Sequence, residues 1–310
     1  RPSTTASARL LPKLLPRPQE EAAWQERKKE VIAMTRTHQQ DLQRFALQIR
    51  IGILEQIQAL GFGHIGGSMS IADALAVLYG SIMRYDAANP AWPQRDKLVC
   101  SKGHAGPAVY AALACKGFFP YEDLKLLNTP GTYLPSHCDK NKTPGVDMTT
   151  GSLGQGTSLA VGMALGDRIK GYDSRTFLIV GDGEANEGQV WEAAMFAAAK
   201  KVTNLTWLID VNGKQLDGYT SDVLEPFSFE DKFRAFGFET VSIDGNDLEQ
   251  LAHALTWQPH DQPLSIIMHT VKGKGVPEIE QTMANHSMTP SPEALNRWLM
   301  ELRTQLYAQN

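Results

Sequence analysis

The sequence has little of what marks a secreted scaffold, a membrane protein or a nucleic-acid binder. Its three cysteines, Cys100, Cys115 and Cys138, are too few for a disulfide framework and lack metal-site spacing, which fits a reducing compartment. A net charge of -4 shows no basic excess, so we expect no nucleic-acid partner. No run of about eighteen apolar residues occurs, and no secretory signal precedes the first helix. We therefore expect a soluble, cytoplasmic protein with no membrane partner.

The first 33 residues differ in composition from the rest of the chain. Arg1 to Pro18 mixes Pro, Ser, Thr and Arg without periodicity, and a charged stretch follows up to Lys29. We expect disorder over residues 1–33. Met34 is a natural start, so this segment is interpreted as a translated leader or vector-derived extension, with a short natural amphipathic extension as the alternative.

Residues 34–310 alternate helical and strand-like segments and are interpreted as one domain. Apolar residues recur at helical spacing from Gln40 to Leu60, from Ile71 to Met83 and from Pro290 to Tyr307. The clearest strands are Thr176–Val180, Asn204–Ile209, Glu239–Ile243 and Leu264–Met268. This alternation predicts an α/β fold with a doubly wound, mostly parallel sheet and helices on both faces. Ligands then belong at the carboxyl ends of the strands.

Two of these strands end in side chains that can bind a metal ion. Asp182 follows one strand, between Gly181 and Gly183, and Asn212 follows the next strand. A crossover helix fits between them, so the two side chains should emerge side by side. Either strand end alone is more typical of a turn. Together with a backbone carbonyl and phosphate oxygens, the pair makes a hard-oxygen set suited to Mg²⁺ or Ca²⁺.

A glycine-rich segment is the candidate anion site. The region Asn128–Gln155 is long and rich in Gly, Pro and Thr, which is typical of a binding loop. Its end, Thr149–Gly156, leads into the predicted helix Thr157–Arg168, where backbone N–H groups can bind a phosphate. Such a loop is weak evidence alone and gains weight beside a metal site.

Three histidines lie in Gly- or Ser-flanked segments: His64, His104 and His137. Imidazole can donate to a phosphate oxygen, hold a substrate hydroxyl or move a proton near neutral pH. A single loop histidine is more often structural, and the remaining ones other than His286 are interpreted in that way. These are His38, His253, His260 and His269, the last of which we expect to be buried and hydrogen-bonded.

Taken together, these motifs resemble the amino-terminal domain of transketolases. The motifs are Gly63-His64, Ser101-Lys-Gly-His104, Ser136-His137, Thr149-Thr-Gly-Ser-Leu-Gly-Gln-Gly156, Gly181-Asp-Gly-Glu-Ala-Asn-Glu-Gly188 and Asp210-Val-Asn212. They occur in the order and spacing of that family over roughly Gln40 to His286, and several motifs in register make the resemblance specific. It implies the thiamine diphosphate-binding fold, of the type called the PP domain.

The resemblance also implies roles for individual residues. Asp182, Asn212 and the backbone carbonyl of Lys214 are expected to bind Mg²⁺ or Ca²⁺, which holds the diphosphate of thiamine diphosphate. His104 looks like the histidine that contacts the diphosphate. The other expected cofactor-binding residues are Gly151, Leu153, Gly154, Gly181, Gly183, Glu184 and Glu187.

Three histidines are expected to be catalytic. His64 and His137 match the family histidines around the reacting carbonyl and the C1 hydroxyl of a ketose donor. His286 falls where the family carries another active-site histidine, although Ser287 replaces the usual glycine beside it. Glu187 and Glu192 match carboxylates that link two active sites across the dimer interface.

In this family a two-carbon ketol unit passes from a ketose (phosphate) to an aldose (phosphate). A full-length transketolase continues into a second domain, whose glutamate contacts the aminopyrimidine of the cofactor, and then a third. This chain ends at Asn310. The resemblance thus implies one subunit of a split transketolase, active only with a partner that carries the pyrimidine-binding domain, in an α2β2 assembly.

Alternatives remain open at this point. The alpha subunit of a 2-oxo acid dehydrogenase also holds the diphosphate half of the cofactor, but should lack the His64 and Ser-Lys-Gly-His104 motifs. Deoxyxylulose phosphate synthase carries its second domain on the same chain. A catalytically silent paralogue would keep the fold alone. Pentose phosphates, branched sugars and sulfonated sugars all remain possible substrates.

Overall fold

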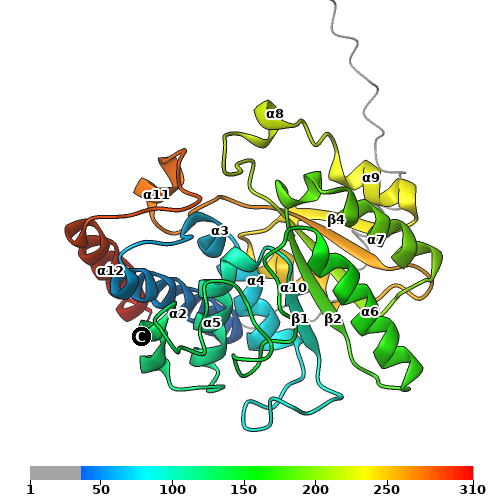
Figure 1. Cartoon of the computed structure of the whole chain (residues 1–310), viewed down its shortest axis with the longest axis horizontal. Helices are drawn as coiled ribbons and strands as arrows, with labels where there is room; N and C mark the ends of the chain where they lie inside the picture. The colour runs from blue at the N-terminus through cyan, green and yellow to red at the C-terminus, as the bar shows by residue number, and fades with distance from the viewer. Residues whose placement is uncertain (1–35, 310) are drawn as a thin grey trace, which may run out of the picture. The chain divides into compact units, whose positions relative to one another are not determined.

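The computed structural model describes residues 36–309, and Figure 1 shows a central sheet with helices on both faces. Within these residues five parallel strands lie in the order β1-β2-β3-β5-β4. The strands are β1 (Lys97–Cys100), β2 (Thr176–Gly181), β3 (Leu205–Val211), β4 (Glu239–Asp244) and β5 (Leu264–His269). The α/β class and the parallel sheet expected from the sequence are confirmed. The disorder expected for residues 1–33 lies outside the described residues.

Strand order decides which face each connecting helix covers. Strands β1 to β4 advance in one direction across the sheet, so right-handed crossovers place their helices on one face. These helices are α6 (Gln155–Ile169), α7 (Gly188–Ala199) and α9 (Phe229–Phe236). The connection from β4 to β5 turns back, and α10 (Leu248–Thr256) therefore lies on the opposite face (Figure 1).

The face that carries α10 is covered by the segments at the two ends of the described chain. Helix α4 (Ala72–Val77) contacts α10, and α2 (Arg36–Leu60) packs on α4. Beyond them lie α5 (Gly106–Cys115) and α12 (Pro292–Tyr307), both of which contact α2. Short helices complete the set: α3 (Gly66–Met69), α8 (Thr220–Val223) and α11 (Pro277–Gln281).

The second helical segment is wound differently from the regular α-helix expected over Ile71–Met83. It is α-helical only to Val77 and continues as a π-helix over Leu78–Ile82, where the N–H of Met83 donates to the carbonyl of Leu78 at 2.8 Å. The widened turn includes Gly80, whose missing side chain lets this backbone approach the side chain of Leu42 on α2. Apolar periodicity predicts the helix but not this local change in its hydrogen bonds.

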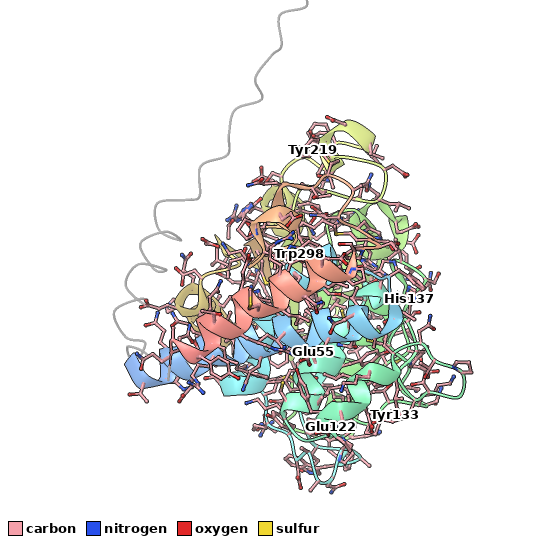
Figure 2. The ribbon with its side chains drawn as sticks, turned by 90° about the vertical axis from the view of Figure 1, so that its left-hand side faces the viewer. Glu55, Glu122, Tyr133, His137, Tyr219 and Trp298 are labelled. Atoms are coloured by element: carbon pink, nitrogen blue, oxygen red, sulfur yellow. The ribbon has the colours of Figure 1, made fainter. Side chains whose placement is uncertain are left out.

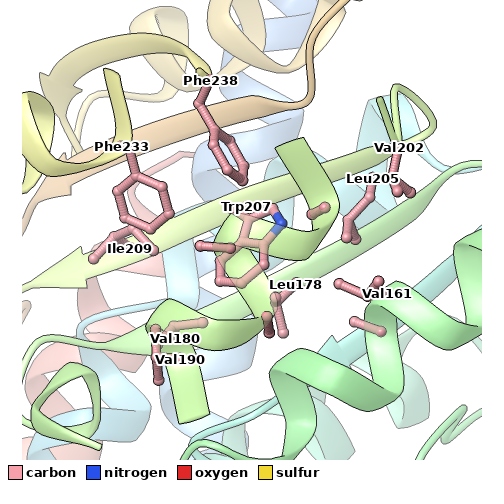
Figure 3. Packing of buried hydrophobic residues seen from close by; sticks show 14 of the residues in the cluster. Val161, Leu178, Val180, Val190, Val202, Leu205, Trp207, Ile209, Phe233 and Phe238 are labelled. Atoms are coloured by element: carbon pink, nitrogen blue, oxygen red, sulfur yellow. The ribbon is translucent and has the colours of Figure 1, made fainter. Parts of the chain in front are cut away.

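The core is centred on β3, which is buried on both faces. Trp207 of β3 is fully buried, and its ring centroid lies 5.7 Å from those of Phe233 and Phe238 in edge-to-face contacts. Figure 3 shows Trp207 between these rings and the branched side chains of β2 and α6. A nearly continuous apolar run is what a central parallel strand requires, since helices cover both of its faces.

Helix α12 closes the apolar side of α2, and Figure 2 shows the two lying along each other. The hydroxyl of Ser291 caps its start by accepting the N–H of Ala294 at 3.2 Å, and Pro292 occupies the first turn. Its buried face carries Leu295, Trp298, Leu299 and Leu302. None of the helices in residues 36–309 is both long and apolar enough to span a membrane.

The ring cluster on β3 generates a stability prediction. Phe233→Ala should lower the free energy of unfolding by about 3–5 kcal/mol, because it leaves a cavity beside Trp207. Urea unfolding followed by tryptophan fluorescence measures this change. Phe227→Ala is the matched control: Phe227 is 71% exposed, so a change within about 0.5 kcal/mol is expected. Equal losses in both variants would contradict the assignment of the core.

Candidate active site

The two predicted metal-binding residues, Asp182 and Asn212, lie at the carboxyl edge of the sheet, after β2 and β3. Asp182 accepts the backbone N–H of Asn212 at 3.0 Å and that of Gly213 at 2.6 Å. Its other carboxylate oxygen accepts the N–H of Gly183 at 2.8 Å. The ends of neighbouring parallel strands meet here, as the sequence predicted, and the carboxylate holds the loop that carries Asn212.

Asp182 is a buried carboxylate, with a residue exposure of 2%. Burial, together with the nearby carboxylate of Asp210, raises its pKa to about 6, although the N–H groups of Gly213 and Gly183 oppose the shift. An anion that is costly to keep ionised is stabilised by a nearby cation. This environment therefore favours a positive charge beside Asp182.

The side-chain amide of Asn212 has a fixed orientation. Its Nδ2 donates to the carboxylate of Asp210 at 2.9 Å, while its Oδ1 accepts the backbone N–H of Lys214 at 3.2 Å. The carbonyl oxygen of Lys214 accepts the ammonium of Lys272 at 2.8 Å, so this oxygen already attracts a cation. One carboxylate, one amide oxygen and one backbone carbonyl fit a hard divalent ion such as Mg²⁺.

This set differs from sites built of several acidic, histidine or cysteine side chains. Within residues 36–309, no group of three or more His, Cys, Asp and Glu side chains is arranged to hold a metal ion. The expected ligands include only one such side chain, Asp182.

A buried ion pair lies next to the two predicted metal-binding residues, because Asp210 accepts the side-chain amide of Asn212. Lys102, 2% exposed, donates to the carboxylate of the fully buried Asp210 at 2.6 Å and to the carbonyl of Gly67 at 2.6 Å. Asp210 also accepts the hydroxyls of Thr270 at 2.5 Å and Ser70 at 2.9 Å. These contacts join the ends of β1, β3 and β5 to α3, and hydrogen bonds offset much of the cost of burying both charges.

Four histidine rings gather at the same edge. The ring centroid of His64 lies 5.4 Å from that of His104, 6.0 Å from His137 and 5.3 Å from His286. The rings of His104 and His286 are 4.7 Å apart. All four side chains named from the sequence are thus together, including His286, although Ser287 departs from the family pattern.

These imidazoles are neutral near pH 7. Burial lowers the pKa of each, and for His286 the pKa falls to about 4, with the ammonium of Lys272 as the next cause. The pKa of His104 is lowered well below its usual value by burial and by Lys102. A neutral ring can accept a proton or a hydrogen bond from a sugar hydroxyl as well as donate one.

The segments that carry His64 and His286 are joined to each other. Gly63 and Met288 exchange two backbone hydrogen bonds of 2.9 Å, and the N–H of Gly66 donates to the carbonyl of Asn285 at 2.9 Å. The side chain of Asn285 is buried and donates to the carbonyls of Lys272 and Ile279 at 3.0 and 2.9 Å. These bonds fix the two histidines relative to Lys272.

The glycine loop lies against the histidine segments. Gly151 has φ +144°, and a side-chain carbon added there would lie 3.0 Å from the ring of His137. A carbon added to Gly103 would lie 2.7 Å from the backbone nitrogen of Gly151. Gly154, with φ +80°, caps the start of α6 in a left-handed conformation that glycine adopts without strain. Close backbone approach explains why small residues occupy these positions.

The remaining predicted cofactor residues fall into two groups. Gly181 and Gly183 flank Asp182, and the side chain of Glu184 is buried and faces inward. Leu153 is 38% exposed, and Glu187 and Glu192 are exposed at the start of α7. The exposed residues can contact another molecule, whereas the carboxylate of Glu184 is engaged within the chain.

Two of the histidines that were interpreted as structural make their hydrogen bonds with residues outside the histidine cluster. His38 is hydrogen-bonded to Ser81 at 3.1 Å. His269 contacts Glu230 at 3.2 Å and Ser242 at 2.9 Å, so the expected hydrogen bonding is confirmed. Its expected burial is wrong, because the side chain is 56% exposed where β5 ends at the surface. Its pKa is raised by the hydrogen bond to Glu230.

Four residues that support the site were not identified from the sequence: Lys102, Asp210, Lys272 and Asn285. Lys272 had an available signal, since it follows the predicted strand over Leu264–Met268 in a Gly-rich segment. Asp210 and Lys102 lie inside the quoted motifs without an assigned role. Asn285 had no signal, because its side chain bonds to the backbone carbonyls of Lys272 and Ile279, which no sequence pattern indicates.

Comparison with known proteins identifies the family of this chain. The family model described as "Transketolase, thiamine diphosphate binding domain" matches residues 42–296. The 6-deoxy-6-sulfo-D-fructose transketolase subunit SqwG of Clostridium sp. (strain MSTE9) is 50% identical over 266 residues, which cover 84% of this chain and 96% of that protein. A transketolase subunit of Actinobacillus succinogenes, named for apulose 4-phosphate, is 35% identical over 83% of this chain and 94% of that protein.

A solved structure shows the same fold in a longer protein. The transketolase of Campylobacter jejuni superposes with a TM-score of 0.79 at 29% sequence identity, over 88% of this chain. The chain spans only 43% of the length of that transketolase, in contrast to its nearly complete coverage of the two subunits above. The sheet, the site motifs and these matches agree, and the chain belongs to the transketolase family as its amino-terminal, thiamine diphosphate-binding domain.

Proposed function

We propose that this chain is the thiamine diphosphate- and Mg²⁺-binding subunit of a cytoplasmic split transketolase. It transfers a two-carbon ketol unit from a ketose to an aldose, and it is active only with a partner that carries the pyrimidine-binding domain. The observation that carries the proposal is the meeting of two groups at one sheet edge: the oxygen set of Asp182, Asn212 and Lys214, and the cluster of four histidines.

Each group has a separate task in this proposal. Asp182, Asn212 and the carbonyl of Lys214 would hold Mg²⁺, and His104 would donate to the diphosphate. Bound thiamine diphosphate supplies the electron sink that carbon–carbon cleavage needs. His64, His137 and His286, neutral near pH 7, would hold the substrate's hydroxyl groups and accept or return protons at its oxygens.

A separate partner is supported by the lengths of the relatives. The chain covers 96% and 94% of two proteins named as transketolase subunits, but only 43% of the Campylobacter jejuni transketolase. Glu187 and Glu192 are exposed at the start of α7, where they are free to contact another chain. An assembly with two copies of each subunit would place these carboxylates between its active sites.

We further propose 6-deoxy-6-sulfo-D-fructose as the first donor to test. The relative named for that sulfonated ketose is 50% identical, whereas the relative named for apulose 4-phosphate is 35% identical. A sulfonate carries one negative charge and a sugar phosphate carries nearly two at neutral pH. Because the two donor classes differ in charge, a sulfonated ketose and a ketose phosphate should be compared as donors in the same assay.

The proposal is tested by reconstitution with a partner subunit that carries the pyrimidine-binding domain. Calorimetric titration of thiamine diphosphate with Mg²⁺ should show weak binding to this chain alone and tight binding to the mixture, which should also transfer ketol units to an aldose. Asp182→Ala should abolish metal-dependent binding, because it removes the only charged ligand of the expected set. Binding without transfer activity would favour a silent paralogue, and no binding in either case would exclude the proposed cofactor.

His137→Ala separates catalysis from cofactor binding. In the reconstituted enzyme it should lower kcat by about 10²-fold or more, while the affinity for thiamine diphosphate changes little, because the ring is expected to contact substrate. Steady-state kinetics and calorimetry measure the two effects. His260→Ala, which alters an exposed histidine, is the matched control. An unchanged kcat in His137→Ala would remove this residue from the catalytic group.

The histidine cluster also predicts a pH dependence of stability. An unfolded histidine binds a proton near pH 6.5, but folded His286 binds one only near pH 4, so the free energy of unfolding should fall as the pH drops through this window. Asp182 has the opposite sign: its raised pKa, about 6, lowers stability as the pH rises from 3.8 to that value.

Comparison of variants isolates the histidine contribution. Urea unfolding of the wild type and of His286→Gln at about pH 7 and about pH 5 should show a smaller loss in the variant, because glutamine does not titrate. His260→Gln should keep the wild-type loss. Equal losses in wild type and His286→Gln would show that the pKa of His286 is not lowered in the folded chain.

A further inference from the structure

The carboxylate of Glu184 is buried and bonded on both oxygens. The residue is 3% exposed. Its Oε1 accepts the hydroxyl of Ser101 at 2.5 Å and the backbone N–H of Gly154 at 2.9 Å, and its Oε2 accepts the N–H of Gly181 at 3.0 Å. The side chain points into the protein and accepts three hydrogen bonds from the same chain. Its carboxylate therefore faces protein groups and not a ligand.

The three donors belong to separate segments that each carry an expected cofactor residue. Ser101 is followed by Lys102 and His104, Gly154 lies in the loop that begins at Gly151, and Gly181 precedes Asp182. Ser101 and Gly154 lie 83 and 30 positions from Glu184 in the chain. Sheet pairing joins the Ser101 segment to β2, because the N–H of Ser101 donates to the carbonyl of Ile179 at 2.8 Å. The loop Gly151–Gly156 belongs to no strand, so side-chain contacts hold it against the other two segments.

The first two segments also pack closely at their glycines. A side-chain carbon on Gly156 would collide with Ser101, and one on Gly103 would lie 2.7 Å from the nitrogen of Gly151. Thr150 adds a bond from its hydroxyl to the carbonyl of Cys100 at 2.8 Å. The glycine loop thus packs closely on the Ser101–His104 segment, and Glu184 is bonded to both.

Charge matters in this contact, because all three partners are donors. A carboxylate offers only acceptor atoms, and charge-assisted bonds offset part of the cost of burying it. A glutamine of the same size would direct its NH₂ group at one of the donors and leave that donor unpaired in a buried setting. A side chain of the same size is therefore not enough: the three donors need the acceptor oxygens of a charged carboxylate.

We propose that Glu184 is a positioning residue: its carboxylate sets the loop Gly151–Gly156 against the segment Ser101–His104 and thereby determines the affinity for thiamine diphosphate without touching the cofactor. The resemblance to transketolases implied a cofactor-binding role for this residue, and the geometry assigns it an indirect one. The inference rests on the proposed function for the identity of the cofactor.

The central test is Glu184→Gln in the complex with the partner subunit. Thiamine diphosphate with Mg²⁺ should bind about 10- to 100-fold more weakly than to wild type, the range expected when a supporting contact behind a ligand site is removed. Glu301→Gln, at an exposed position of α12, is the matched control and should bind as wild type does. Unchanged affinity in Glu184→Gln would overturn the proposal.

Hydrogen exchange distinguishes positioning from a general loss of stability. In Glu184→Gln without cofactor, backbone amides of Ser101–His104 and Gly151–Gly156 should exchange faster, while those of α12 keep their wild-type rates. Faster exchange throughout the chain, with a matching fall in Tm, would reduce the role to fold stability. This measurement needs no cofactor, so it decides the loop-positioning role even if the proposed function itself fails.

Ser101→Ala probes the same contact from the other side. It should weaken binding in the same direction but less than Glu184→Gln, because one of three bonds is lost. The loss of binding free energy in the double variant should be smaller than the sum of the losses in the two single variants, since both substitutions remove one shared interaction. Strict additivity in this cycle would show that Ser101 and Glu184 act independently and would contradict the proposed joint positioning.

Discussion

The buried pair of Lys102 and Asp210 is the interaction on which the site depends. It joins the end of β1 to the end of β3, and its neighbours Ser70 and Thr270 extend the network to α3 and to the segment after β5. Such a pair is often no more stabilising than apolar side chains would be, but loss of one partner leaves a buried, unpaired charge. Its consequence here is geometric: Asp210 orients the amide of Asn212, and Lys102 leads directly to His104.

The sheet provides the second constraint. Its parallel strands bring chain segments from widely separated parts of the sequence to one edge, and each segment leaves the sheet through a glycine-rich turn. Those turns then need fixing by contacts between segments. The bonds of Gly63 with Met288, of Asn285 with Lys272, and of Glu184 with the glycine loop serve this purpose. The site is thus a set of loops held by buried polar groups above an apolar core.

Much of this arrangement could be predicted from the sequence, for identifiable reasons. The strand ends at Asp182 and Asn212 follow from apolar runs and glycine, and parallel pairing places them side by side whatever the rest of the chain does. Family spacing placed His64, His104, His137 and His286 in one site, and the rings do meet. Side-chain contacts between loops could not be predicted, because no spacing rule links Asn285 to Lys272 or Glu184 to Ser101. The exposure of His269 was missed for a related reason, since a strand's last residue can face solvent even when the strand is buried.

The ammonium of Lys272, bonded to the carbonyl of Lys214, has a consequence for how ligands enter the site. Two lysines and two aspartates, Lys102, Lys272, Asp182 and Asp210, make the region close to electroneutral when all are charged. A dication arriving alone would meet Lys272, and a diphosphate arriving alone would meet Asp182. Under the proposed function each ligand would lower the electrostatic cost of admitting the other, so their binding would be thermodynamically linked.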